Sequence, residues 1–141
     1  YGTMQIGIIG AGYIGQTLYD LFWEDHLVML YDRSPETSAS NDETILEGSD
    51  IIFIAVNTSA KGVGKGGRPV PQYGNFADAM KVAHHYVKDR GTIVVESSVP
   101  PGTTYQYFSQ LISSKTVGLA YSPERIDPGN THHTISTTLK L

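Results

Sequence analysis

The sequence of 141 residues contains no cysteine. Disulfide bonds and thiolate metal sites are therefore excluded within it, and we expect a reducing, cytoplasmic setting. Long apolar runs are also missing, because no stretch approaches the roughly 20 residues that a bilayer-spanning helix needs. Positive charge is scarce: ten lysines and arginines stand against 14 acidic residues, without a basic stripe. We therefore expect neither nucleic acid nor a membrane as a partner.

The rest of the composition is that of an ordinary globular domain, with 40% hydrophobic and 17% charged residues. Such a chain is long enough to bury a core of its own. Residues 1–3 lack the apolar region of a targeting signal and are interpreted as a remnant of cloning, which leaves residues 4–141 as one domain. We expect no metal site, because the neighbours His84 and His85 would point about 100° apart on a helix. His132 and His133 have no carboxylate or cysteine at a useful spacing.

A strand, a tight turn and a helix are predicted at the start of the domain, in residues 4–15, MQIGIIGAGYIG. The apolar run ends in glycines at the G-x-G-x-x-G spacing, which is typical of a dinucleotide-binding turn whose helix amino terminus receives the pyrophosphate. A flexible loop can carry the same spacing by chance. The candidate cofactor ligands of this glycine turn are Gly10, Gly12, Tyr13, Ile14 and Gly15.

The second predicted strand, residues 27–31, ends at Asp32. In dinucleotide-binding folds an acidic side chain roughly 20 residues after the glycines accepts hydrogen bonds from the adenosine ribose, and Asp32 stands close to that spacing. A carboxylate there repels a 2′-phosphate, so Asp32 predicts NAD rather than NADP as the cofactor. Arg33 could attract such a phosphate, but we interpret it as lying over the adenine. In the alternative interpretation Asp32 is a plain turn residue before Ser34-Pro35.

Three more parallel strands are predicted at 51–56, 92–95 and 116–121, and the uninterrupted apolar run at 51–56 is typical of a central one. One helical turn is expected within 38–48. Helices are expected from Asn75 onward, with Asp78 completing a capping box, and from Thr103 onward.

The segment 61–74 is rich in glycine and positive charge, but Lys65 is followed by Gly66 and so does not fit a Walker phosphate loop. It is a surface loop or a lid whose Lys61, Lys65 or Arg68 reaches the pyrophosphate.

The polar or glycine residues just past these strands are the most informative pattern. Right-handed crossovers place all such ends at one edge of a parallel sheet, where ligands bind in open α/β folds. We therefore predict an α/β fold, Rossmann-like and doubly wound, with a mainly parallel sheet and helices on both faces. The residues that meet at this edge are Gly10, Asp32, Thr58, Ser98 and Glu124, which adds the last three to the candidate cofactor ligands.

Four segments together resemble the UDP-glucose/GDP-mannose dehydrogenase family in its amino-terminal NAD-binding domain. They are GAGYIG at 10–15, VNT at 56–58, ESSVPPGTT at 96–104 and YSPERIDPGN at 121–130. The resemblance covers nearly the whole chain, and its last two segments are specific. It implies a cytoplasmic, homo-oligomeric enzyme of nucleotide-sugar metabolism, supplying polysaccharide precursors, that oxidises the C6 alcohol of a UDP-sugar to the uronic acid with two NAD. The PER-x-x-PG form favours UDP-N-acetylhexosamines and the glycine-lysine loop favours UDP-glucose, so the sugar stays open.

The resemblance also implies catalytic roles for Ser98 and Glu124. Ser98 takes the place of a threonine that positions a catalytic water, although it lacks the methyl group. Glu124 matches a glutamate that acts near thioester hydrolysis and the nicotinamide, whereas Pro128 replaces a second acidic residue.

The family's nucleophile is a cysteine, assisted by a lysine of the next domain. We therefore expect a piece truncated before the central helix and the C-terminal domain, which binds NAD without turning over sugar. The alternatives are a β-hydroxyacid dehydrogenase cofactor domain and a Rossmann nucleotide-sensing regulatory module.

Overall fold

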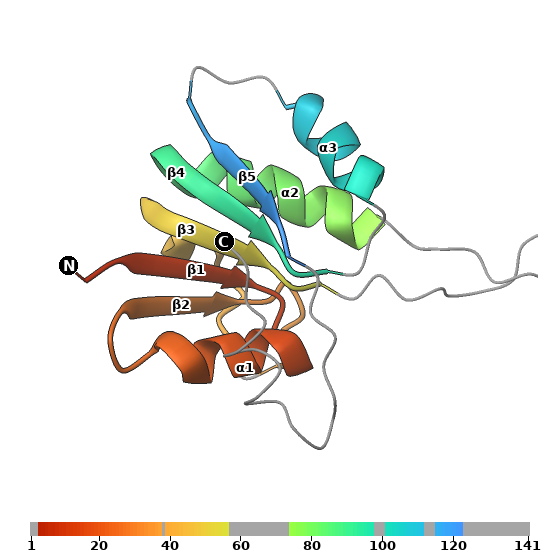
Figure 1. Ribbon diagram of the computed structural model, residues 1–141. Helices are drawn as coiled ribbons and strands as arrows, with labels where there is room; N and C mark the ends of the chain where they lie inside the picture. Colours follow the sequence, from red (N-terminus) through yellow and green to blue (C-terminus); the bar gives the residue numbers. More distant parts are fainter. Residues whose placement is uncertain (1–2, 38, 57–73, 98–100, 112–114, 123–141) are drawn as a thin grey trace, which may run out of the picture.

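The computed structural model describes residues 3–37, 39–56, 74–97, 101–111 and 115–122. Five strands form one sheet in the order β2-β1-β3-β4-β5, and every neighbouring pair is parallel. Figure 1 shows this sheet with its helices. The predicted α/β fold is thereby confirmed. The elements are β1 Gln5–Ile9, α1 Tyr13–Phe22, β2 Leu27–Tyr31, the short 3₁₀ helix η1 Glu43–Leu46, β3 Ser49–Ile54, α2 Gly74–Tyr86, β4 Val87–Val95, α3 Pro101–Ser109 and β5 Gly118–Tyr121.

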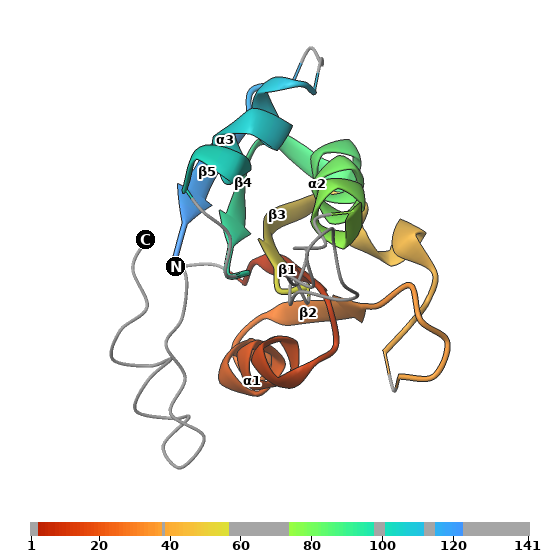
Figure 2. The same ribbon diagram turned by 90° about the vertical axis from the view of Figure 1, so that its right-hand side faces the viewer.

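Helices cover both faces of the sheet, α1 on one and α2 with α3 on the other (Figure 2). Side chains of a strand alternate between the faces. Ile8 and Phe53 accordingly pack with Leu18 of α1, whereas Ile54 of β3 packs with Met80 of α2 in a second cluster. The central strands read as continuous apolar runs because both of their faces are covered.

The strand order reverses between β1 and β3. Helix α1 leads from β1 outward to β2, whereas the chain then returns past β1 to β3 and proceeds through α2 to β4. In open parallel sheets a crevice forms at such a switch point, beyond the carboxyl ends of the strands. All five carboxyl ends lie at the same edge of the sheet (Figure 1).

Several predicted boundaries are wrong. Asn75 and Thr103 do not cap helices, because α2 begins at Gly74 and α3 at Pro101; a proline is well suited to the first turn, where its missing N–H costs no hydrogen bond. Strand β4 begins at Val87 rather than Thr92, and a register shift in its pairing with β3 accommodates the extra residues. Arg90 there has a φ of 67°.

The two neighbouring histidines of α2 differ in exposure. His85 is exposed as expected, whereas His84 is half-buried and its ring contacts Phe108 edge-on. Burial, with the charge of Lys115, lowers the pKa of His84. Within the described ranges, no cluster of three or more His, Asp or Glu side chains could hold a metal ion. In the same ranges no helix has the length and apolar character to cross a membrane.

Candidate functional site

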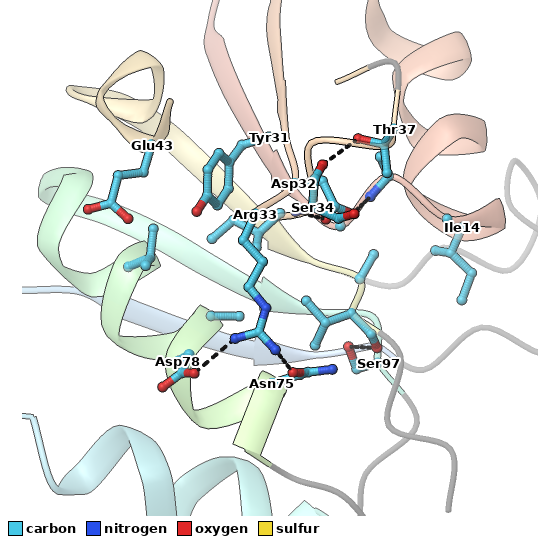
Figure 3. Close-up of a pocket in the computed structure, with 18 of the residues that line it drawn as sticks. Ile14, Tyr31, Asp32, Arg33, Ser34, Thr37, Glu43, Asn75, Asp78 and Ser97 are labelled. Carbon is cyan, nitrogen blue, oxygen red and sulfur yellow. Dashed lines mark hydrogen bonds and ion pairs between the residues drawn. The ribbon is translucent and has the colours of Figure 1, made fainter. Parts of the chain in front are cut away.

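A pocket of about 760 Å³ opens at the switch point, between the turn after β1 and the first turns of α2 (Figure 3). The tips of β1, β2, β3 and β4 all contribute to it. Its lining residues are Ile9, Gly10, Ala11, Gly12, Tyr13, Ile14, Tyr31, Asp32, Arg33, Ser34, Thr37, Glu43, Ala55, Val56, Asn75, Asp78, Ala79, Val82 and Ser97.

The three glycines of the turn have different structural roles. Gly10 has a φ of +110°, which L side chains rarely adopt, and a Cβ there would lie 2.4 Å from the Ala55 oxygen. A Cβ on Gly15 would lie 1.7 Å from the Gly10 oxygen, so α1 packs directly on the turn. Around Gly12, by contrast, no atom of the described residues lies within 4 Å of such a Cβ, apart from its chain neighbours and the backbone of α1. The turn is therefore closed underneath and open at Gly12, toward the pocket.

Helix α1 presents its amino terminus to this open space. Gly12 is its N-cap residue, in an extended conformation and without a side-chain cap. The first N–H groups of a helix have no acceptor within the helix, and they and the helix dipole attract anions. With the room left at Gly12, this arrangement fits a pyrophosphate group. Tyr13 and Ile14 border the same space, and the Tyr13 side chain is half exposed.

Asp32 is held rigidly at the tip of β2. Its Oδ2 accepts a hydrogen bond from the Ala11 N–H at 2.8 Å, and its Oδ1 accepts one from the Ser34 N–H at 2.9 Å. The carboxylate therefore ties the β2 tip to the glycine turn. Each oxygen has a further lone pair, so the group can still accept hydrogen bonds from a ligand in the pocket that it lines.

Arg33 reaches from the β2 tip to α2, as Figure 3 shows. One guanidinium nitrogen donates to Asp78 Oδ2 at 3.1 Å, and the other donates to Asn75 Oδ1. The side chains of Arg33 and Asp78 are 58% and 60% exposed. We call the three residues the Arg33 bridge; they connect two walls of the pocket.

One wall of the pocket is apolar and is made by Val56, Ala79 and Val82 with the Tyr31 ring. Burial raises the pKa of Tyr31, and the charges of Glu43 and Asp32 raise it further, against the opposing effect of Arg33. The phenol is therefore neutral at neutral pH. Such a wall suits a flat, uncharged ring.

Ser97 joins the tips of β3 and β4. Its hydroxyl lies 3.3 Å from the Ile54 oxygen and 3.0 Å from the Val56 oxygen, to which it can donate. The side chain of Glu96, just before it, is completely buried. Ser97 lines the pocket, whereas Ser98, the predicted residue, lies outside the described residues.

The structure brings most of the predicted cofactor ligands together. Gly10, Gly12, Tyr13, Ile14, Asp32 and Arg33 all line the pocket. Gly15 instead lies under the turn and shapes it. Thr58, Ser98 and Glu124 lie outside the described residues, as do Lys61, Lys65 and Arg68.

Sequence reasoning missed the contributions of Glu43, Asn75, Asp78 and Ser97. Ser97 could have been found, because it follows a strand. Asn75 and Asp78 were assigned to a capping box, and no local pattern indicates their contact with Arg33.

Comparison with known proteins decides the family. Residues 24–140 match the UDP-glucose/GDP-mannose dehydrogenase family, NAD binding domain. The chain belongs to this family. NAD is accordingly the cofactor of this domain, as predicted from Asp32. Neither a β-hydroxyacid dehydrogenase nor a nucleotide-sensing module is favoured by the match.

Individual relatives agree with this assignment. Protein CapL of Staphylococcus aureus is 28% identical over 97% of this chain and 38% of its own length. A UDP-N-acetyl-D-mannosamine dehydrogenase of Methanococcus aeolicus is 40% identical over 60% of this chain and 19% of its own. The fold matches that of a UDP-D-ManNAc dehydrogenase from Pyrococcus horikoshii, with a TM-score of 0.75 and 21% identity over 91% of this chain and 38% of that one. The chain thus spans less than half the length of these relatives.

Proposed function

We propose that this chain is the cofactor-binding part of a nucleotide-sugar 6-dehydrogenase that oxidises the C6 alcohol of a UDP-sugar to the uronic acid. The observation that carries the proposal is the pocket at the switch point, where open space at Gly12, the amino terminus of α1 and the fixed Asp32 carboxylate meet. Bound NAD⁺ would supply the hydride acceptor. The conversion of an alcohol to a carboxylate removes two hydrides and adds one oxygen from water, so it consumes two NAD⁺ for each sugar.

Each part of the pocket suits one part of the cofactor. The N–H groups at the start of α1 would bind the pyrophosphate, and Asp32 would accept hydrogen bonds from the adenosine ribose. The apolar wall of Val56, Ala79 and Val82 would hold the adenine, with Arg33 at its exposed side. The nicotinamide would then extend past Ser97, beyond the carboxyl end of β4. Ser98 and Glu124 remain the expected catalytic residues. Their catalytic roles rest on the family resemblance.

The substrate class is supported by the names of relatives. Several are UDP-N-acetyl-D-mannosamine dehydrogenases, and one is the putative UDP-glucose 6-dehydrogenase YtcA of Bacillus subtilis. A UDP-sugar is the chemistry that they share, and UDP-N-acetylmannosamine is the first substrate to test. In a cell, we place the complete enzyme in the cytoplasm as a homo-oligomer that supplies precursors for polysaccharides.

This chain should bind NAD⁺ without oxidising sugar, because it contains no cysteine that could form the covalent intermediate. Calorimetric titration with NAD⁺ tests the expected binding. The Asp32→Ala variant should bind NAD⁺ at least about tenfold more weakly, because a charge-assisted hydrogen bond to the ribose is lost. Absorbance at 340 nm with UDP-N-acetylmannosamine and NAD⁺ tests the expected lack of sugar oxidation. Absent NAD⁺ binding, or NADH formation by this chain alone, would contradict the proposal.

A further inference from the structure

The Arg33 bridge joins the β2 tip to α2 across the pocket, over a separation of more than 40 residues in sequence. Asn75 and Asp78 both line the pocket on the α2 side, and Asp32 lines it on the other. Figure 3 shows the guanidinium extending away from the Asp32 carboxylate and toward Asn75 and Asp78. The arginine next to the ribose-binding position is thus engaged on the opposite wall.

An arginine at this position has two possible effects on cofactor choice. If its guanidinium is free at the strand tip, it can form paired hydrogen bonds with a 2′-phosphate and so favour NADP. If its guanidinium is bound elsewhere, the neighbouring carboxylate governs the site and repels that phosphate. The formal charges of Asp32 and Arg33 cancel, so the position of the arginine decides between these effects. In this structure Asp78 adds a second carboxylate, which makes the rim net negative.

The stability of the fold does not explain the bridge. Both charged side chains are more than half exposed, and ion pairs of this kind stabilise folded proteins little. Two acceptors on successive turns of α2 do, however, engage both terminal nitrogens of the planar guanidinium, and this fixes its orientation. The arrangement is therefore better suited to directing the arginine than to holding the protein together.

We infer that Asp78 is a specificity-determining residue, which excludes NADP by holding Arg33 against α2 and away from the space beside the ribose. It acts through Arg33 and is thus a positioning residue. The inference rests on the proposed binding of the ribose by Asp32. It predicts that cofactor choice changes when Asp78 is removed, although Asp32 stays in place.

The test compares the affinities of the chain for NAD⁺ and NADP⁺ by competition titration, which keeps the ratio measurable when NADP⁺ binds weakly. In Asp78→Ala the preference for NAD⁺ over NADP⁺ should fall about two- to fivefold, the range that a single exposed charge contact commands. The matched control is Asp20→Ala, an exposed aspartate in α1 that is absent from the pocket lining. It removes the same charge and should leave the preference unchanged.

Arg33→Met separates positioning from simple repulsion. If Asp78 acts through Arg33, then Asp78→Ala in the Arg33→Met background should change the preference by much less than in the wild-type background. An equal change in both backgrounds would show that Asp78 acts only by repelling the phosphate, and would overturn the inference. An unchanged preference in Asp78→Ala would overturn it as well. In either case NAD⁺ binding by the wild-type chain would still support the proposed function, whereas its absence would contradict both.

Discussion

Replacement by alanine should lower the stability of the fold at Gly15 and the affinity for NAD⁺ at Gly12. A methyl group on Gly15 would lie 1.7 Å from the Gly10 oxygen, which is a backbone atom and cannot rotate away. Helix α1 would have to move off the glycine turn. Overpacking of this kind costs about 3 kcal/mol at the upper end of its usual range, which lowers the melting temperature of a domain this size by about 10 °C.

Beyond its own turn, the methyl group of Gly12→Ala meets no atom of the described residues within 4 Å. The backbone of Gly12, with a φ of −77°, is accessible to alanine. The loss of glycine at an N-cap costs at most about 1 kcal/mol, so this variant should fold. Its methyl group would instead occupy the space in which we place the pyrophosphate. We expect NAD⁺ affinity to fall at least about tenfold, which corresponds to about 1.4 kcal/mol.

Thermal unfolding followed by circular dichroism measures the first effect, and calorimetric titration with NAD⁺ measures the second. The two variants serve as controls for each other, because each adds one methyl group to the same turn. Wild-type stability in Gly15→Ala would refute the packing of α1 on the turn. Wild-type NAD⁺ affinity in Gly12→Ala would refute the placement of the pyrophosphate.

Three further predictions concern polar contacts that stabilise the fold. Lys115 Nζ donates to the carbonyl oxygens of His84, His85 and Val87, the nearest at 2.5 Å, so Lys115→Met should lower the free energy of unfolding by about 1–2 kcal/mol in urea titrations. The Ser97 hydroxyl contacts two carbonyl oxygens at the end of the neighbouring strand. Ser97→Ala should therefore lower the free energy of unfolding by about 1 kcal/mol in the same titrations. Hydrogen bonds from Lys88 and from the Gln5 N–H lower the pKa of Asp50. Its stabilising effect is therefore complete above the unfolded-state pKa of about 4 and is lost as the pH falls through the lower folded-state pKa, so Asp50→Asn should flatten the acid limb of the stability profile. An unchanged acid limb in that variant would contradict the assignment.

The sheet was predictable because its strands are apolar runs with polar ends. Residues 27–31 form β2 as predicted, since the run is bounded by His26 and Asp32. The amino-terminal part of β4 was not predictable, because residues 88–91 are charged or glycine and largely exposed. Long-range contacts hold it: Val87 pairs with Ser49, and Arg90 N–H donates to the Thr116 oxygen at 2.6 Å.

The site was predictable to the extent that it follows from topology. The parallel arrangement of the strands alone brings Gly10 and Asp32 to one edge of the sheet. The direction of the Arg33 side chain is different, because it depends on Asn75 and Asp78 in an element far along the chain. Their spacing fitted a helix cap equally well. Tertiary contacts between exposed polar side chains leave no periodic signal in a sequence.

An NMR titration of the ¹⁵N-labelled chain with NAD⁺ shows directly whether one dinucleotide site lies at the switch point of the sheet. The amide signals of Gly12, Tyr13, Ile14 and Asp32 should shift together and follow one saturable binding curve with a single dissociation constant. Signals of Trp23 and Leu27, at the opposite end of α1 and β2, should stay in place. Shifts confined to residues outside the pocket, or no saturable shifts, would contradict this placement of the site.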